Sequence, residues 1–197
     1  MYSIQRSSLI TLLAAAAVIT ACGDNPEEPI PGGGDPENIS RVTVTLSPQG
    51  GGTAATSNRF DPDGAQLPLP VGAASATLVL HKGVTYNGVT ALLNDLDANN
   101  VVDISAEVLE EANFHRFFYT ISCPGVTIPV NSLNSDTQSP PQPLGSTFQV
   151  VVDAAAATTA TCTLNIQLHH FETNKGDGTG SNFETDLDID FPVSIQP

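Results

Sequence analysis

The chain has 197 residues, with 21 acidic and 6 basic side chains and a formal net charge of −15. Such an excess of negative charge argues against nucleic acid or anionic lipid headgroups as partners, and it suits cations or a basic protein, although it serves solubility equally well. The length fits one domain that is large enough to bury a real hydrophobic core.

Residues 1–21 have the pattern of an export signal. Arg6 precedes an apolar run over residues 9–18, and small residues then lead to Cys22. The run is too short to span a bilayer, which needs about 20 residues, and it is typical of a cleaved signal peptide. The cysteine resembles that of a bacterial lipobox, which implies a lipidated Cys22; an ordinary signal peptide with an incidental cysteine is the alternative.

Residues 22–38 are rich in Pro, Gly and acidic side chains and hold almost nothing that could be buried. This composition predicts a disordered tether. The acids that follow the cysteine resemble the signals that send some Gram-negative lipoproteins to the outer face of the outer membrane. We therefore expect a lipid-anchored, surface-exposed outer-membrane protein whose folded domain covers residues 39–197.

The folded part shows short alternating strands and turn signals about every 8–12 residues, the pattern of a sandwich or barrel. The sequence predicts an all-β fold, an antiparallel β-sandwich or open barrel with one short helix. Two of the strands are expected to form a hairpin around the Lys82-Gly83-Val84 turn. The predicted strands are residues 40–48, 53–60, 73–81, 85–94, 114–119, 148–152, 161–170 and 183–191.

Residues 95–103 form an acidic loop that has part of the spacing of a calcium-binding loop. Asn100 stands where that loop needs glycine, and Ala106 stands where it needs glutamate. An acidic loop without calcium is therefore the favoured interpretation. Asp103 is a suitable N-cap for a helix over residues 104–113.

The last two strands, joined by a polar loop, alternate between apolar and polar side chains, as a sheet with one buried face requires. We predict that they pair with His169 opposite Glu184, and with Leu168 facing Thr185 on the inside. This register makes the polar face a ladder of carboxylates that ends at the histidines. The ladder consists of Glu184, Asp186, Asp188 and Asp190.

Cys123 and Cys162 remain after Cys22, and each lies in a strand-like run. An even pair of cysteines in an exported protein predicts a disulfide, here between two strands. A thiol nucleophile or a metal thiolate is the alternative.

Histidines and acids suggest a metal site. His115 and His170 have the strand parity of their apolar neighbours, whereas His169 lies with the acids. A single histidine on such a face is more often a hydrogen-bonded core residue than a ligand. Imidazole and carboxylate together suit Zn²⁺ or a similar divalent ion. The candidate ligands are His115, His169, His170, Glu184 and Asp186.

The chain shows no motif of an enzyme, since it lacks Gly-x-Ser-x-Gly, HExxH and CxxC patterns. We therefore expect a binding protein and no catalysis. The alternative is a structural or protein-interaction lipoprotein without a small ligand, presenting loops such as residues 131–145 to a partner.

Several segments are similar to a family of short Gram-negative lipoproteins that carry the label "type 1 periplasmic binding fold superfamily protein". They are EEANFHRFFY at 110–119, VTVTL at 42–46, TYNG at 85–88 and the final TDL and FPVSIQ segments. The family resembles accessory lipoproteins of TonB-dependent receptors. This implies capture of a scarce nutrient, such as a transition metal, for an outer-membrane receptor.

The resemblance also implies which side chains matter. The family's histidines match His115 and His170, and its Glu-Thr-Asp matches Glu184 and Asp186. His169 stands where the family usually has Arg. The family label implies a long α/β fold, whereas the alternation in this chain predicts an all-β one.

Overall fold

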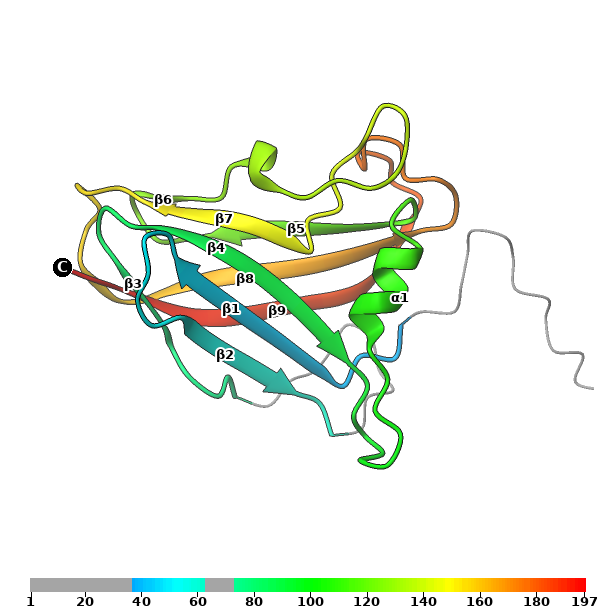
Figure 1. Cartoon of the computed structure of the whole chain (residues 1–197), viewed down its shortest axis with the longest axis horizontal. Coiled ribbons are helices and arrows are strands. Elements are labelled where there is room, and N and C mark those ends of the chain that lie inside the picture. The colour runs from blue at the N-terminus through cyan, green and yellow to red at the C-terminus, as the bar shows by residue number, and fades with distance from the viewer. Residues whose placement is uncertain (1–36, 63–72) are drawn as a thin grey trace, which may run out of the picture.

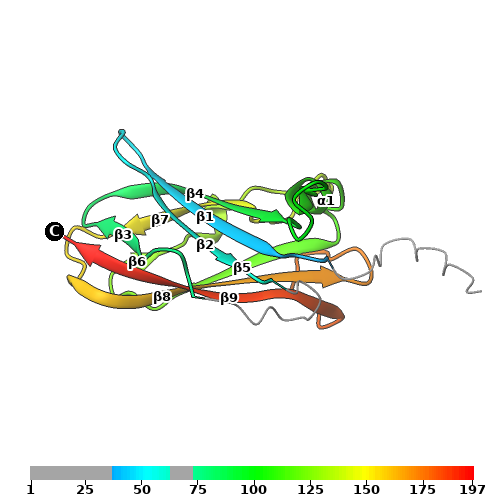
Figure 2. The ribbon, with the colours of Figure 1, turned by 90° about the horizontal axis from the view of Figure 1, so that it is seen from below.

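A computed structural model describes residues 37–62 and 73–197 of the chain. The predicted signal peptide, Cys22 and nearly all of the predicted tether lie outside these residues. The described chain forms two β-sheets packed face to face, with one short helix at one end (Figures 1 and 2). The predicted all-β sandwich is therefore confirmed.

One sheet has five strands in the order β2-β1-β4-β7-β6, and the other has four in the order β3-β9-β8-β5. The predicted alternation is what builds the core, because the apolar side of each strand faces the opposite sheet. Val42, Val44 and Leu46 of β1 are buried in this way, as are Ile166 and Leu168 of β8. The strands are β1 Arg41–Pro48, β2 Ala55–Phe60, β3 Leu78–His81, β4 Thr85–Leu93, β5 His115–Ile121, β6 Val126–Thr127, β7 Thr147–Val152, β8 Thr159–Phe171 and β9 Phe183–Gln196.

The hairpin predicted around Gly83 is wrong. β3 pairs in parallel with β9 in one sheet, and β4 pairs with β1 and β7 in the other. The turn is tight, with Gly83 at a φ of 74°, but it carries the chain from one sheet to the other. A turn signal between two alternating runs is equally compatible with both connections, because it fixes a change of direction and leaves the partner open.

The helix α1 (Ile104–Glu110) begins where it was predicted and ends three residues earlier. The Asp103 side chain accepts a hydrogen bond from the Ala106 backbone N–H, as an N-cap does. Ile104 and Val108 are buried, and the Ser105 hydroxyl accepts from the Leu92 N–H of β4. The helix is therefore fastened to the five-stranded sheet.

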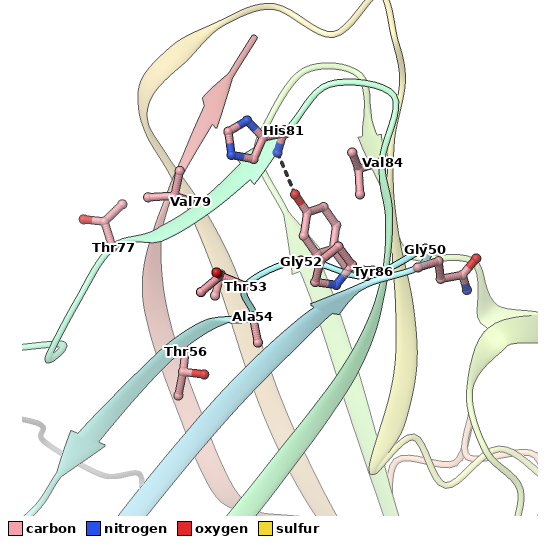
Figure 3. A pocket seen from close by; sticks show the side chains of 14 residues that line it. Gly50, Gly52, Thr53, Ala54, Thr56, Thr77, Val79, His81, Val84 and Tyr86 are labelled. Atoms are coloured by element: carbon pink, nitrogen blue, oxygen red, sulfur yellow. Dashed lines mark hydrogen bonds between the residues drawn. The ribbon is translucent and has the colours of Figure 1, made fainter.

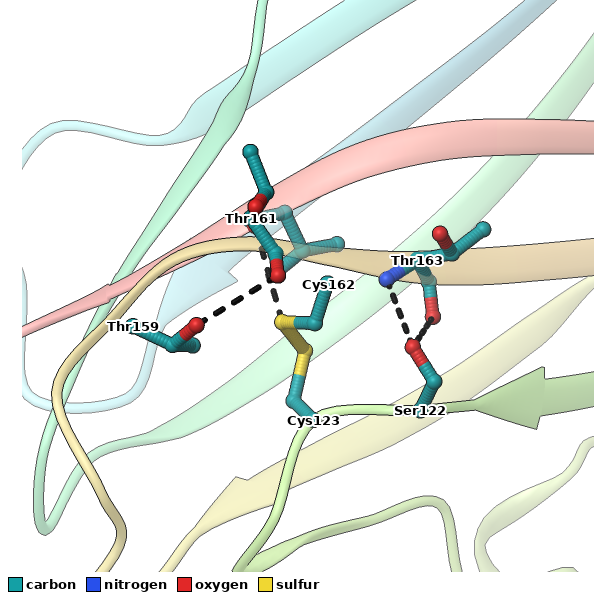
Figure 4. Close-up of a disulfide and its surroundings, with 7 residues drawn as sticks. Ser122, Cys123, Thr159, Thr161, Cys162 and Thr163 are labelled. Atoms are coloured by element: carbon teal, nitrogen blue, oxygen red, sulfur yellow. Dashed lines mark hydrogen bonds between the residues drawn. A yellow bond between two sulfur atoms is a disulfide. The ribbon is translucent and has the colours of Figure 1, made fainter.

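A disulfide joins Cys123, just after β5, to Cys162, near the start of β8 (Figure 4). The two Cα atoms lie 5.2 Å apart. β5 and β8 are antiparallel neighbours, so the bridge holds one end of this pair. The other end of the same pair carries His115 of β5 and both His169 and His170 of β8.

Candidate metal centre

Four titratable side chains meet between the sheets at the end of the sandwich next to α1. They are Glu37, His115, His170 and Asp186, and each offers a ligand atom within 4.8 Å of the others. All four are buried, with His115 and Asp186 fully inaccessible and Glu37 and His170 each 5% exposed. We refer to these four residues as the His/acid cluster.

The two histidines are brought together by strand pairing. His115 is the first residue of β5, and it lies directly opposite His170 of β8. The pair continues inward with Phe117 opposite Leu168, so both rings point the same way as core residues. Their ring centroids are 4.3 Å apart. Figure 1 shows the start of β5 and the end of β8 beside α1.

Asp186 reaches the cluster through a β-bulge. Leu168 pairs with Leu187, but the next residue, His169, pairs with Thr185, which leaves Asp186 as the extra residue. Consecutive residues normally point to opposite faces, and a bulge breaks this rule locally. Asp186 and Leu187 are accordingly both buried.

The predicted register of β8 and β9 is wrong, although their antiparallel pairing is as predicted. Leu168 lies opposite Leu187 and not Thr185, and His169 lies opposite Thr185 and not Glu184. The predicted carboxylate ladder therefore loses one member to the interior. Asp188 and Asp190 remain outside, where both accept hydrogen bonds from the Asn165 amide.

Two predicted ligands do not join the cluster. His169 points to the outer face, where its ring stacks on Phe183 at 3.8 Å and lies 4.6 Å from Phe118. Glu184 pairs with His170 in the sheet but is exposed at the rim. Strand parity is the reason for the first result, since His169 and His170 are neighbours on one strand.

Glu37 is the ligand that the sequence did not predict. It lies in the coil before β1, in the segment assigned to the disordered tether. Its Oε1 lies 2.5 Å from His115 Nε2, and its Oε2 lies 3.6 Å from His170 Nδ1. The signal that could have found it is Ile39, a fully buried residue only two positions on, which extends the buried part of the chain past the start of β1.

Several buried polar atoms of the cluster make no hydrogen bond to any described residue. They are Glu37 Oε2, His170 Nε2 and both carboxylate oxygens of Asp186. A buried polar atom without a partner costs about 1–3 kcal/mol, and more when it is charged. So many in one place call for a group that would satisfy them together.

Burial and mutual contacts also shift the pKa values of the cluster residues. Burial, and then the neighbouring Glu37, raise the pKa of Asp186 to about 10, so the metal-free protein keeps a proton there. Burial also opposes ionisation of Glu37, but contacts with His115 and Asp186 outweigh it and lower its pKa to about 2. Burial lowers the pKa of His170, and the nearby His115 lowers it further. This histidine is therefore neutral at pH 7.

His115 is oriented as metal-bound histidines are. Its Nδ1 lies 3.2 Å from the Glu111 backbone carbonyl, which can only accept, so Nδ1 carries the proton. In this tautomer, Nε2 would present its lone pair to a metal ion bound in the cluster. In most metal sites, the ring nitrogen that does not bind the metal makes a hydrogen bond of this kind, which fixes the orientation of the ring and its tautomer.

These side chains fit a divalent cation. Two neutral imidazoles and two carboxylates balance a charge of +2, and tetrahedral ligands at about 2.0–2.1 Å lie roughly 3.3 Å from one another. The Asp186 Oδ2 atom lies 3.8 Å from His115 Nε2, and Glu37 Oε2 lies 3.6 Å from His170 Nδ1. The cluster could therefore hold a metal ion after small adjustments of its side chains.

The acidic loop after β4 has a structural use. Asp95 accepts from the Arg41 guanidinium at 2.6 Å and from the Ser40 hydroxyl at 2.7 Å. Asp97 caps the turn at Asn99. The first residue of the calcium-like pattern is thus engaged by the start of β1.

A pocket of about 670 Å³ opens at the opposite end of the sandwich, between the turn after β1 and the edge strand β3 (Figure 3). It is lined by threonines, glycines and apolar side chains, and none of its lining residues is acidic. Tyr86 spans it and its hydroxyl accepts from the His81 backbone N–H. One histidine without a carboxylate is a poor cation site, so the charged chemistry is concentrated in the His/acid cluster.

No protein-family model, curated protein or solved structure matches this chain. In the part of the chain that the structure describes, no helix is both long and apolar enough to cross a membrane.

Proposed function

We propose that this protein is a non-enzymatic, lipid-anchored binding protein that captures a divalent metal ion of zinc-like character. The ion is held by Glu37, His115, His170 and Asp186, and it is passed to a TonB-dependent receptor in the outer membrane. The observation that carries the proposal is the buried, incompletely satisfied His/acid cluster.

The ligand set indicates the class of cation. Calcium and magnesium prefer shells made of oxygen atoms, whereas imidazole suits zinc and other late transition metals. Two histidines among four ligands therefore favour a zinc-like ion. The negative net charge of the chain would raise the local concentration of any cation around it.

The burial of the cluster supports a role in binding. Catalytic zinc sites keep one position open for water or substrate, whereas closed sites use four protein ligands. Here four ligand residues converge, and none is more than 5% exposed. Such a site holds an ion and shields it from solvent.

The proposed location at the outer membrane is inferred from the sequence. A lipidated Cys22 would anchor the chain, and the acids after it would direct it to the outer face of the outer membrane. The resemblance to accessory lipoproteins supplies the TonB-dependent receptor as the recipient of the ion.

Metal analysis of the purified mature chain tests the binding proposal. We expect about one zinc per chain to be retained, and His115→Ala and His170→Ala to lose it. The matched control is His169→Ala, which removes the neighbouring ring on the outer face and should keep the metal. A wild-type chain that retains no zinc, or a cluster variant that retains it fully, overturns the proposal.

Capture of a receptor tests the second part. Immobilised zinc-loaded protein, incubated with solubilised outer membranes of its own source, should retain a TonB-dependent receptor. Retention of other outer-membrane proteins alone would contradict this step and would favour a structural or interaction role.

A further inference from the structure

Glu37 differs from the other three residues of the His/acid cluster in how its backbone is held. His115, His170 and Asp186 lie on β5, β8 and β9, which are neighbours in one sheet. His170 lies on β8, which is paired on both sides, whereas β5 is the edge strand and is held by its pairing with β8. Glu37 precedes β1 and belongs to neither sheet.

The chain is firmly fixed only two residues beyond Glu37. Ile39 is fully buried, and Ser40 donates through its backbone N–H to the Leu93 carbonyl at 2.9 Å. The Ser40 hydroxyl also donates to Asp95 at 2.7 Å. Among the described residues, the Glu37 backbone makes a turn bond in which its carbonyl accepts from the Ile39 N–H at 2.9 Å.

Among the described residues, the Glu37 side chain is what joins position 37 to the sandwich core. It contacts one histidine from β5 and one from β8. A metal ion at the cluster would add a bond to this carboxylate and would tie the coil to three strands. Such a coupling is reciprocal. If the bound ion favours docking of the Glu37 carboxylate by some factor, then withdrawal of the carboxylate lowers the affinity for the ion by the same factor.

We propose that Glu37 is a detachable ligand, through which the N-terminal segment sets the metal affinity of the cluster. This inference rests on the proposed metal-binding function. In the sequence, the residues before Glu37 lead to Cys22, the predicted anchor. A receptor that engages this segment would withdraw one ligand and release the ion, while the three ligands on the sheet stay in place.

Zinc affinity of the full mature chain, measured by competition with a chelating dye, provides the first test. Mutation of a residue that only supports a metal ligand lowers metal affinity by about 10–100-fold. Because Glu37 would bind the ion directly, Glu37→Gln should lower the affinity for zinc by at least about 100-fold. Glu184→Gln is the matched control, because it removes an exposed carboxylate opposite His170. This variant should bind zinc as the wild type does.

Amide hydrogen exchange at Ile39 provides the second test, because this N–H reports on the turn that holds Glu37. We expect zinc to slow the exchange of this amide at least about tenfold, with little change at Leu168 in the middle of β8. Glu37→Gln should abolish the effect at Ile39.

The outcomes separate this inference from the function on which it rests. A wild-type chain that binds no zinc removes both. A chain that binds zinc with Glu37→Gln equal to Glu184→Gln, or with unchanged exchange at Ile39, keeps the metal site and overturns the detachable ligand. Loss of affinity in Glu37→Gln alone, together with zinc-dependent protection at Ile39, supports it.

Discussion

Two buried groups of charged side chains lie at the α1 end of the molecule, and they differ in how completely they are paired. In the first, Lys175 donates to the Asp136 carboxylate at 2.6 Å and also to the Ala112 carbonyl. Asp136 accepts in addition from the backbone N–H groups of Gln138 and Gln142. Both charged side chains are fully buried, and they carry opposite charges.

The His/acid cluster is the second group, and it is incomplete. It has two carboxylates, no lysine or arginine, and several buried atoms without hydrogen bonds. A buried charge whose partners are all present serves structure, because it fastens segments together. A buried group that lacks a cation is better explained by a ligand. The comparison predicts that replacing Lys175 lowers the free energy of unfolding, whereas replacing Asp186 raises it in the metal-free protein.

Replacing Lys175 by methionine should give the largest effect. It leaves Asp136 buried without its cation, and breaking a buried pair in this way costs about 3–5 kcal/mol. We expect the free energy of unfolding, measured by urea denaturation, to fall by this amount. The double variant Lys175→Met, Asp136→Leu should recover most of the loss, and a Lys175→Met chain as stable as the wild type would contradict the structural role.

Zinc should supply to the His/acid cluster the positive charge that Lys175 supplies to Asp136. Binding to the folded chain alone raises the free energy of unfolding by about 2.7 kcal/mol at a free concentration of 100 times Kd. Thermal unfolding of the wild type and of Lys175→Met should both shift upward with zinc. His170→Ala should show no shift, and an equal shift in that variant would place the ion elsewhere.

Asp186→Asn should stabilise the metal-free protein, in contrast to the loss expected at Lys175. Asp186 has to keep a proton in the fold that it loses in the unfolded chain at pH 7, because its pKa is raised to about 10. An amide of the same shape removes this cost and can donate to Glu37. We expect a gain on the order of 1–2 kcal/mol in chelator-treated protein, together with loss of the zinc response. A destabilised metal-free variant would mean that the carboxyl group is needed for packing.

Much of the fold could be predicted from the sequence because strands with one buried face alternate strictly. β1, β8 and the inward parity of His115 and His170 followed from that pattern. Sheet membership did not, because the partner of a strand depends on contacts distant in sequence. The parallel pairing of β3 with β9 is such a contact.

The site could be predicted only in part, for two physical reasons. A bulge adds one residue and reverses the faces beyond it, and nothing in the alternating acids of β9 marks where it falls. Glu37 lies in a stretch whose composition indicates disorder, and composition is silent about a single side chain that folds back. His115 and His170 were found by residue type and inward parity, and Asp186 by residue type and the resemblance although parity placed it outside. The fourth ligand required the structure.

The smallest expected effect is the pH dependence of the Lys175–Asp136 pair. Burial alone would raise the pKa of Asp136, but hydrogen bonds from Gln142, Lys175 and Gln138 outweigh it and lower the pKa. The folded chain then binds this proton less readily than the unfolded chain, whose aspartates titrate near about 3.9. The stabilisation is therefore fully present above that pH and is lost as the pH falls through the lower pKa of the folded state.

Urea denaturation of chelator-treated protein at pH 5, 4 and 3 measures this dependence. The difference in unfolding free energy between the wild type and Asp136→Asn should shrink as the pH falls from 4 to 3, because the wild-type carboxylate loses its advantage there. The difference should stay constant above pH 5, where Asp136 is ionised in both states. A difference that grows with acidity would mean that Asp136 is held in its protonated form, as Asp186 is, and the contrast between the two groups would then fail.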